Sequence, residues 1–317
     1  MSYFVGIDLG GTNIATGVTD EEGNLLCKYS VKTLAEEGFE SVAGRMADAA
    51  LEVIRQSGID KSEIAGVGVG VPGATDPATG DVMLAENLKW RRVPLKRVLE
   101  ERIGLPVFMG NDGDCAALGE MWAGNGKGLD SGILITIGTG IGSGVIINKK
   151  IFTGDTGGGT EAGHVPLVFG GELCGCGQHG CYEAYASCTA LIRQTKRAMD
   201  ANPDSLMWES FRERGKVDGR TAFTAARKGD AAAQKVIDQY ISYLAAGLAG
   251  LINVFRPEII IIGGGVSNEG DPLLVPLNQK IVEYCYGSDV LIPPKAIKAK
   301  LGNDAGIIGA ALLCRGQ

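Results

Sequence analysis

The sequence lacks any apolar run of the roughly 18 residues that a membrane-spanning helix needs. Its first residues also lack the basic start and small-residue cleavage site of an export signal. We therefore expect a cytoplasmic protein whose eight cysteines are reduced thiols. An excess of basic residues is missing as well, because the net charge is −7. This charge argues against a surface for nucleic acid or for an anionic membrane.

Two further absences narrow the class of protein. No GxxxxGK[ST] loop is present, so we exclude a P-loop enzyme. No low-complexity segment or Ser/Gly-rich linker interrupts the chain of 317 residues, of which 45% are hydrophobic. This length and composition favour about two domains with a substantial core. Glycine is abundant instead, with 49 residues that concentrate after strand-like segments. Glycine at such places permits tight turns and close approach of a ligand.

The apolar pattern predicts two similar cycles of structure. Strands are expected over residues 3–8, 14–19 and 25–31, with a glycine turn at 10–13. A strand at 132–137, a glycine loop at 138–144 and a strand at 145–148 repeat this order, which suggests two related domains. Further strands are expected at 64–71, 107–109 and 259–262. Helices are expected at 39–56, 95–103, 112–121, 231–255, 273–284 and 305–313, with a polar surface excursion at 200–220.

The first glycine loop follows the first expected strand and contains Asp8, Gly10, Gly11 and Thr12. Backbone N–H groups of such a turn hold phosphate oxygens, and the Thr12 hydroxyl adds another donor. A carboxylate at the strand end can hold Mg²⁺, usually through water. A plain glycine hairpin with a surface aspartate would have the same sequence, so both interpretations stand for this loop alone.

Two later glycine segments favour a nucleotide site. The loop at 138–144 resembles the GxGxG of a dinucleotide fold, but strand-like residues follow it where a Rossmann site needs a helix. A second phosphate hairpin instead fits an ATP clamp made by two domains. Residues 263–265 are glycines that end a buried strand, which suits close approach by adenosine. A structural turn would give the same pattern.

Asn111 and Asp112 lie between an expected strand and an expected helix. A carboxylate such as Asp112 at a helix start is commonly just a cap, and that interpretation stays open. A kinase, however, needs a carboxylate to accept the proton of the attacking hydroxyl, and a strand-to-helix junction is where such a side chain would project.

The densest cluster of reactive side chains lies between residues 161 and 183. It contains three cysteines and both histidines of the chain, namely His164, Cys174, Cys176, His179 and Cys181. Three thiolates and one imidazole are the ligands of a closed tetrahedral zinc site. We favour His164 as the fourth ligand, because the cysteines form a compact knuckle that needs a distant partner; His179 is a competing ligand. A redox thiol group or unbound buried cysteines are the alternatives.

Together these motifs resemble the ROK family of sugar kinases and sugar-responsive repressors, within the hexokinase–actin ATPase fold. The resemblance runs from Asp8 to the C-terminal Gly-Ala-Ala segment, and C-x-C-G-x-x-G-C is matched in full. The family often has Ile where Ala162 stands and Leu where Tyr182 stands. The resemblance implies an α/β fold with two ribonuclease-H-like (actin/hexokinase ATPase) domains and an interdomain cleft. We place the smaller domain at residues 1–112 plus 304–317 and the larger one, with the zinc knot, at 113–303.

The resemblance also implies roles for particular residues. Asp112 would be the general base toward a sugar hydroxyl, and His164 would both hold Zn²⁺ and touch the sugar. Zinc would then organise the site and would not act as a Lewis acid. The implied sugar-binding residues are Gly73, Asn87, Asn111, Asp112, Glu161, His164 and Glu183. The implied residues for Mg²⁺-ATP are Asp8, Gly10, Gly11, Thr12, Asn13, Thr139, Gly140, Gly264 and Gly265. The implied zinc ligands are His164, Cys174, Cys176 and Cys181.

The function implied is an ATP-dependent hexose kinase that phosphorylates the 6-hydroxyl, with glucose the favoured sugar. N-acetylmannosamine, N-acetylglucosamine or fructose are alternatives, since a single substituent changes binding by only about 1–3 kcal/mol. Polyphosphate is an alternative donor, and a homodimer or homotetramer is expected from the family. A sugar-sensing repressor is disfavoured, because Asp8 begins the first loop almost at residue one and leaves no room for a DNA-binding helix-turn-helix. A chaperone- or actin-like ATPase is disfavoured by the cysteine cluster.

Overall fold

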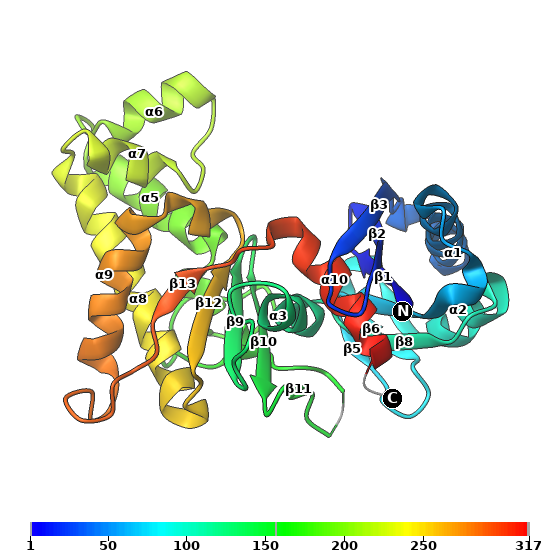
Figure 1. The fold of residues 1–317 in the computed structure, drawn as a ribbon. Helices are drawn as coiled ribbons and strands as arrows, with labels where there is room; N and C mark the ends of the chain where they lie inside the picture. The colour runs from blue at the N-terminus through cyan, green and yellow to red at the C-terminus, as the bar shows by residue number, and fades with distance from the viewer. Residues whose placement is uncertain (1, 156, 316–317) are drawn as a thin grey trace. The chain divides into compact units, whose positions relative to one another are not determined.

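The computed structural model describes residues 2–155 and 157–315, which form a mixed α/β fold (Figure 1). One sheet has the strand order β3-β2-β1-β4-β8, and another has the order β11-β10-β9-β12-β13. Counted along the chain, both sheets have the order third, second, first, fourth, fifth. This shared topology supports the internal repeat inferred from the sequence, and the expected fold class is confirmed.

The first sheet contains β1 (Tyr3–Leu9), β2 (Asn13–Thr19), β3 (Leu25–Lys32), β4 (Ile64–Val71) and β8 (Val107–Asn111). Strand β1 pairs antiparallel with β2 and parallel with β4, as expected for a meander followed by a crossover. Helix α1 (Phe39–Ser57) packs on β2 and β3, whereas α10 (Ala305–Leu312) packs on β1 and β4. Helix α2 (Leu95–Ile103) lies beside α1 and β8. A small sheet of β5 (Ala74–Thr75), β6 (Val82–Ala85) and β7 (Trp90–Val93) was not predicted.

Helix α10 approaches the first sheet so closely that only glycine fits at the contact. A Cβ at Gly68 would overlap the backbone oxygen of Ala310. On its other side, α10 packs against α3 (Asp112–Trp122), where a Cβ at Gly309 would overlap the backbone oxygen of Cys115. These backbone contacts fix α3, and therefore its first residue, relative to β1 and β4.

The second sheet contains β9 (Gly132–Ile137), β10 (Ile141–Ile147), β11 (Lys150–Ile151), β12 (Ile259–Gly263) and β13 (Ala296–Lys298). The helices that follow are α4 (Glu183–Ala186), α5 (Cys188–Ala201), α6 (Met207–Arg214), α7 (Thr221–Arg227), α8 (Ala231–Phe255) and α9 (Asp271–Tyr284). Helix α8 packs against α5, α7 and α9. Its buried apolar side chains recur every three or four residues, which explains why its bounds could be predicted from sequence. None of the described helices combines the length and the apolar character of a membrane span.

Two details of the sequence prediction were wrong. Strand β10 begins at Ile141, inside the segment that was predicted to be a glycine loop, because Ile141 is buried in the sheet. The polar segment at 200–220 contains α6, whose Met207 is fully buried and was missed among its charged neighbours.

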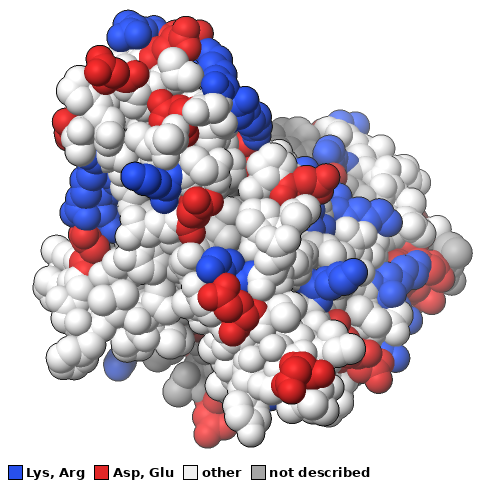
Figure 2. Space-filling view, turned by 90° about the vertical axis from the view of Figure 1, so that its left-hand side faces the viewer, with Lys and Arg blue, Asp and Glu red and all other residues white. Residues whose placement is uncertain are grey.

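The chain divides into two compact units. The first comprises residues 1–134, 143–160 and 300–317, and the second comprises 135–142 and 161–299. The division falls within β9 and β10, and it keeps α3 with the first unit because α3 packs on α10. The boundary at residue 112 that we infer from the sequence stays a prediction. On the face shown in Figure 2, basic and acidic side chains are interspersed.

Candidate active site and metal centre

The first part of the candidate site is the turn between β1 and β2. The N–H of Gly10 donates to the backbone oxygen of Asn13 over 2.9 Å and closes the hairpin. Thr33 supports the turn from outside, since its hydroxyl donates to the Gly10 oxygen over 2.6 Å and its N–H donates to the Thr12 oxygen over 3.0 Å. The turn therefore keeps a fixed shape without using the Thr12 side chain, which stays available to a ligand.

Asp8 lies at the end of β1, where it pairs with Ala15 of β2 and Gly70 of β4. The pKa of Asp8 is raised to about 6. Burial is the main cause, and the neighbouring Asp112 carboxylate is the second. Both causes disfavour the ionised form, and a nearby cation would reverse them. The chemistry of this carboxylate therefore suits a bound metal ion such as Mg²⁺.

A cavity of about 630 Å³ lies beside this turn within the first unit. Its lining includes the predicted residues Asp8, Gly10, Gly11, Thr12 and Asn13. It also includes Lys28 of β3 and Asp304, whose side chains form an ion pair at 3.1 Å. Sequence reasoning missed these two, because Lys28 is one of the alternating exposed residues of an ordinary edge strand.

Asn111 and Asp112 have different places at the start of α3. Asn111 is the cap: its side-chain oxygen accepts from the N–H groups of Gly113 at 2.8 Å and Asp114 at 3.3 Å. Its amide nitrogen donates to the backbone oxygen of Gly73 over 3.1 Å. Asp112 is the first residue of the helix. Because Asn111 caps the helix, capping does not explain the carboxylate of Asp112. Its carboxylate also accepts from the Gly113 N–H at 2.8 Å.

Gly73 and Asn87 belong to the neighbourhood of the small sheet. A Cβ at Gly73 would overlap the backbone oxygen of Leu84 in β6, so this position is constrained by packing as well as by its bond to Asn111. Asn87 lies exposed on the short 3₁₀ turn Glu86–Leu88 between β6 and β7. The structure thus brings Gly73 to Asn111, while Asn87 stays at a separate, solvent-facing turn.

The second part of the site is the cysteine cluster. The ligand atoms of His164, Cys174, Cys176 and Cys181 all lie within 4.8 Å of one another. The Cys176 and Cys181 sulfurs are 3.7 Å apart, and the Cys174 sulfur is 3.7 Å from His164 Nδ1. A tetrahedral ion with bonds of about 2.3 Å to sulfur would place its ligands about 3.7 Å apart. The cluster therefore has the dimensions of a metal site, and the spacing is far too long for a disulfide.

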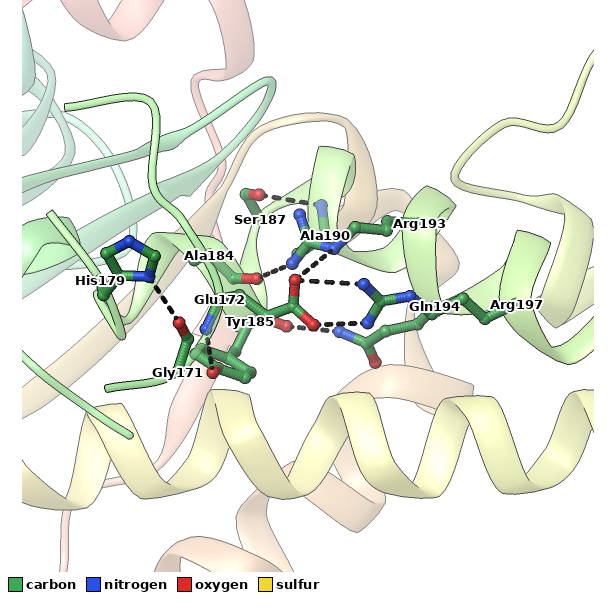
Figure 3. Close-up of polar contacts among 10 residues, drawn as sticks. All are labelled: Gly171, Glu172, His179, Ala184, Tyr185, Ser187, Ala190, Arg193, Gln194 and Arg197. Atoms are coloured by element: carbon green, nitrogen blue, oxygen red, sulfur yellow. Dashed lines mark hydrogen bonds and ion pairs between the residues drawn. The ribbon is translucent and has the colours of Figure 1, made fainter. Parts of the chain in front are cut away.

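His179 does not belong to the cluster. Its Nδ1 lies 2.9 Å from the backbone oxygen of Gly171, and its side chain is exposed (Figure 3). The structure thus places His164, and not His179, beside the three sulfurs, and its role as a metal ligand stays a prediction. Because Nδ1 of His164 faces the sulfurs, its Nε2 is left for another partner.

The loop that carries the cysteines is held by its own backbone. Gly180 has φ +85° and donates to the Glu172 oxygen over 2.8 Å, and a Cβ there would overlap the Val168 oxygen. The N–H of Cys174 donates to the Gln178 oxygen over 2.8 Å and closes the knuckle. Without a metal, burial raises the pKa of Cys174 to about 12. Metal binding to this loop would therefore displace protons.

Glu183 joins the cluster to the second glycine loop. One carboxylate oxygen accepts from the N–H of Ile141 at 2.9 Å, and the other lies 3.4 Å from the Cys174 sulfur. A Cβ at Gly140 would overlap this carboxylate. Gly140, predicted to contact nucleotide, thus has a second role, because it lets Glu183 approach the loop. Glu161 precedes the 3₁₀ turn Ala162–His164, which presents His164.

Thr139 and the third glycine segment meet at the ends of β9 and β12. The Thr139 oxygen accepts from the Thr189 hydroxyl over 2.7 Å, which fixes the loop on the start of α5. Gly264 has φ +79°, and a Cβ there would overlap the Ile137 oxygen at the end of β9. A Cβ at Gly265 would meet nothing within 4 Å. Gly264 is thus required by the fold, whereas Gly265 borders open space that a ligand could occupy.

Tyr182 replaces the Leu expected from the family and is fully buried. Its hydroxyl donates to the Leu244 oxygen of α8 over 2.9 Å, and its ring lies against Gly247. The larger side chain is accommodated because α8 has a glycine at this position. Cys181, the neighbouring residue of the cysteine cluster, is therefore attached to the longest helix of the second unit.

The chain is similar to known proteins over nearly its full length. A sequence model of the ROK family matches residues 4–317. The chain is 40% identical over 312 residues to a glucokinase of Thermotoga maritima, covering 98% of this chain and 96% of that protein. It resembles the crystal structure of a ROK glucokinase from Streptomyces griseus with glucose and AMPPNP, with a TM-score of 0.83, 37% identity and full coverage of both chains. A ROK hexokinase from Thermus thermophilus gives a TM-score of 0.83 and 36% identity, covering 98% of this chain and 97% of that one.

The two repeated sheets thus define a protein of the actin and hexokinase ATPase fold. The chain belongs to the ROK family.

Proposed function

We propose that this protein is an ATP-dependent glucose kinase that transfers the γ-phosphoryl group of ATP to the 6-hydroxyl of glucose. The observation that carries the proposal is the full-length similarity to glucokinases. The arrangement of Asp112 and of the metal cluster supports it, because a carboxylate that is not the helix cap and an imidazole with a free nitrogen are both suited to sugar hydroxyls.

On the sugar side, Asp112 acts as the general base. Its carboxylate accepts the proton of the 6-hydroxyl as that oxygen attacks the γ-phosphorus, and ADP leaves with the bond to the β-phosphate oxygen broken. Hydrogen bonds from further polar groups hold the other hydroxyls and orient the attacking one. We assign this role to Gly73, Asn87, Asn111, Glu161, His164 and Glu183.

On the nucleotide side, Asp8 would hold Mg²⁺, which would neutralise phosphate charge. The N–H groups of the first glycine turn and the Thr12 hydroxyl donate to phosphate oxygens. The buried, unfavourable charge of Asp8 supports this assignment, since a cation would compensate it. The remaining nucleotide contacts are assigned to Asn13, Thr139, Gly140, Gly264 and Gly265.

We propose that the metal held by His164, Cys174, Cys176 and Cys181 is zinc. Four protein ligands would complete the coordination of such an ion, so its role would be to orient His164 and not to polarise the sugar. The distances of 3.7 Å within the cluster support this ion.

The decisive test of the base is Asp112→Asn. We expect kcat to fall by about 10²–10⁴-fold with a small change in the KM for glucose, because the amide keeps the shape but accepts no proton. ADP release is measured in a coupled assay with ATP. Asp48 is exposed on α1, so Asp48→Asn is the matched control and should turn over like the wild type. Near-normal turnover of Asp112→Asn would contradict the assignment.

The sugar and the donor are tested in the same assay. Glucose should give the highest kcat/KM in a panel with N-acetylmannosamine, N-acetylglucosamine and fructose, and ATP should exceed polyphosphate as donor. A preference for an N-acetylhexosamine would replace the proposed substrate while keeping the reaction. If no sugar stimulates ADP release, the kinase proposal fails.

A further inference from the structure

A second cavity, of about 490 Å³, lies within the second unit, outside the residues assigned to sugar, nucleotide and metal. It is formed by one face of α5 and one face of α8, whose lining residues recur every three or four positions along each helix. Its volume is typical of a site for a small ligand. The lining includes three cations (Arg193, Arg197 and Lys235) and a single carboxylate, Glu172.

The charges in this cavity do not balance. Glu172 faces both arginines: it pairs with Arg197 at 2.5 and 3.2 Å and lies 3.6 Å from Arg193 Nε (Figure 3). No ion pair involves Lys235 within residues 2–155 and 157–315. Three positive groups share one negative group, so the cavity has a net charge of about +2, which matches a phosphate monoester.

Two buried polar atoms in the lining lack a hydrogen-bond partner in the described part of the chain. They are the side-chain oxygen of Gln194, an acceptor, and Arg193 Nε, a donor that lies 3.6 Å from the Glu172 carboxylate, within ion-pair range but beyond hydrogen-bond distance. Gln194 is held in place, because its amide nitrogen donates to the Tyr185 oxygen over 2.8 Å (Figure 3). Buried polar groups without partners are costly, and a ligand with both an anion and hydroxyl donors would satisfy both atoms.

The start of α8 does not supply the anion site by itself. Asp230 caps this helix and accepts from the Ala233 N–H at 2.7 Å, so at least one of the first N–H groups is already used, and the Asp230 carboxylate would repel an anion there. Binding must therefore come from the side chains. The Tyr185 and Tyr243 rings, 4.8 Å apart, provide an apolar wall against which a sugar ring could lie.

We propose that this cavity binds a sugar phosphate, with the phosphate on Arg193, Arg197 and Lys235 and a hydroxyl on Gln194. The kinase reaction would itself make such a molecule, but the site stands on its own residues and not on the proposed function. The cavity also borders the loop of residues 164–181 that carries the cysteines, the metal loop. The Glu172 N–H donates to the Tyr185 hydroxyl over 2.7 Å, and Tyr185 packs on Cys174 and Cys181.

The test is calorimetric titration of the intact zinc-loaded protein with glucose 6-phosphate and, separately, ribose 5-phosphate, which is not a product of the proposed reaction. We expect saturable binding of both, weaker binding of inorganic phosphate, and at least tenfold weaker binding after Arg197→Gln or Lys235→Gln. Glu172→Gln should tighten binding, because it releases the arginines. Lys196→Gln, which removes an exposed charge from the same helix outside the cavity, is the control and should bind like the wild type.

Three results would overturn the proposal. They are the absence of saturable binding, equal weakening by Lys196→Gln and Arg197→Gln, and binding that neither cavity variant changes. The last result would place the ligand elsewhere, such as the active site. Because binding is measured without turnover, a failed kinase assay and a failed cavity test remain distinguishable.

Discussion

Asp8 shows at the scale of one residue how a functional group can oppose stability. Its pKa is raised to about 6 by burial and then by the Asp112 carboxylate. The unfolded chain holds this proton less tightly, with a pKa of 3.8. The stabilising contribution of protonated Asp8 is therefore complete below pH 3.8 and is lost as the pH rises through 6. At neutral pH the folded protein keeps an ionised carboxylate in an unfavourable place.

We therefore expect Asp8→Asn to stabilise the protein free of nucleotide and Mg²⁺ while nearly abolishing turnover. A shift of about 2 pKa units corresponds to roughly 3 kcal/mol at pH 7.5, and to about half of that at pH 5, as an upper estimate. Urea unfolding of the wild type and of Asp8→Asn at the two pH values measures this difference in the free energy of unfolding.

Asp48→Asn is again the control, and its difference from the wild type should not vary with pH. If Asp8→Asn is less stable than the wild type at pH 7.5, the carboxylate is not strained and its role must be structural. Added Mg²⁺ should stabilise only proteins that keep Asp8.

The candidate residues were largely predictable from sequence where chemistry imposed a residue type. Cysteines and a histidine at metal-ligand spacing, and an aspartate at a strand-to-helix junction, gave signals that the structure places in suitable positions. Their roles toward sugar and nucleotide stay predictions. What sequence could not give was side-chain pairing, such as Glu183 bonding the Ile141 N–H. The cavity of Arg193 and Arg197 was also missed, because surface cations on helices look alike until the helices are packed.

At the scale of elements, α8 and Tyr182 fit each other. A Cβ at Gly247 would overlap the Tyr182 ring, whereas a Cβ at Gly250, three residues later on the same helix, would meet nothing within 4 Å. The two glycines therefore offer a matched pair for separating packing from helix propensity.

Gly247→Ala should lower the free energy of unfolding by about 1–3 kcal/mol, because the added methyl overpacks a buried contact. Gly250→Ala should raise it by about 0.5–1 kcal/mol, because alanine favours a helix. Chemical unfolding of both variants measures these changes.

Tyr182→Leu combined with Gly247→Ala provides the check on this interpretation. Leucine shortens the side chain, so the double variant should recover part of the loss caused by Gly247→Ala alone. Equal effects of the two alanine substitutions would show that Tyr182 does not restrict this part of α8.

Long elements were predictable because their apolar pattern is sustained, as a period of three or four residues in α8 and as nearly continuous buried runs in β1 and β4. Short elements were not. Strands β5, β6 and β7 have at most four residues, too few for a period to appear. The close contact between α10 and Gly68 could not be predicted either, because a glycine in a strand does not identify which element packs against it.

For the whole molecule, the repeated sheet order explains why the sequence showed two similar cycles. Both cycles need a strand, a tight turn and a second strand, so both keep apolar runs around glycine. The second unit then differs by the metal loop, whose apolar packing is a small cluster around Cys174, Cys181 and Tyr185, while Phe169 and Leu173 are exposed. Backbone hydrogen bonds and glycine turns hold this loop, and a bound metal ion would add to its order.

Removing the metal should consequently affect the two units differently. We expect one zinc ion per chain by elemental analysis, and loss of that ion after Cys176→Ser or strong chelation. The KM for glucose should then rise about tenfold or more, because His164 loses its support, while the KM for ATP changes less. Hydrogen exchange should accelerate over residues 161–186 and stay slow in β1 and β4.

His179→Gln is the control, since this side chain bonds Gly171 outside the cluster and should leave the zinc content unchanged. Equal acceleration of exchange in both units would mean that the ion supports the whole fold, and an unchanged KM for glucose would separate the metal from the sugar site.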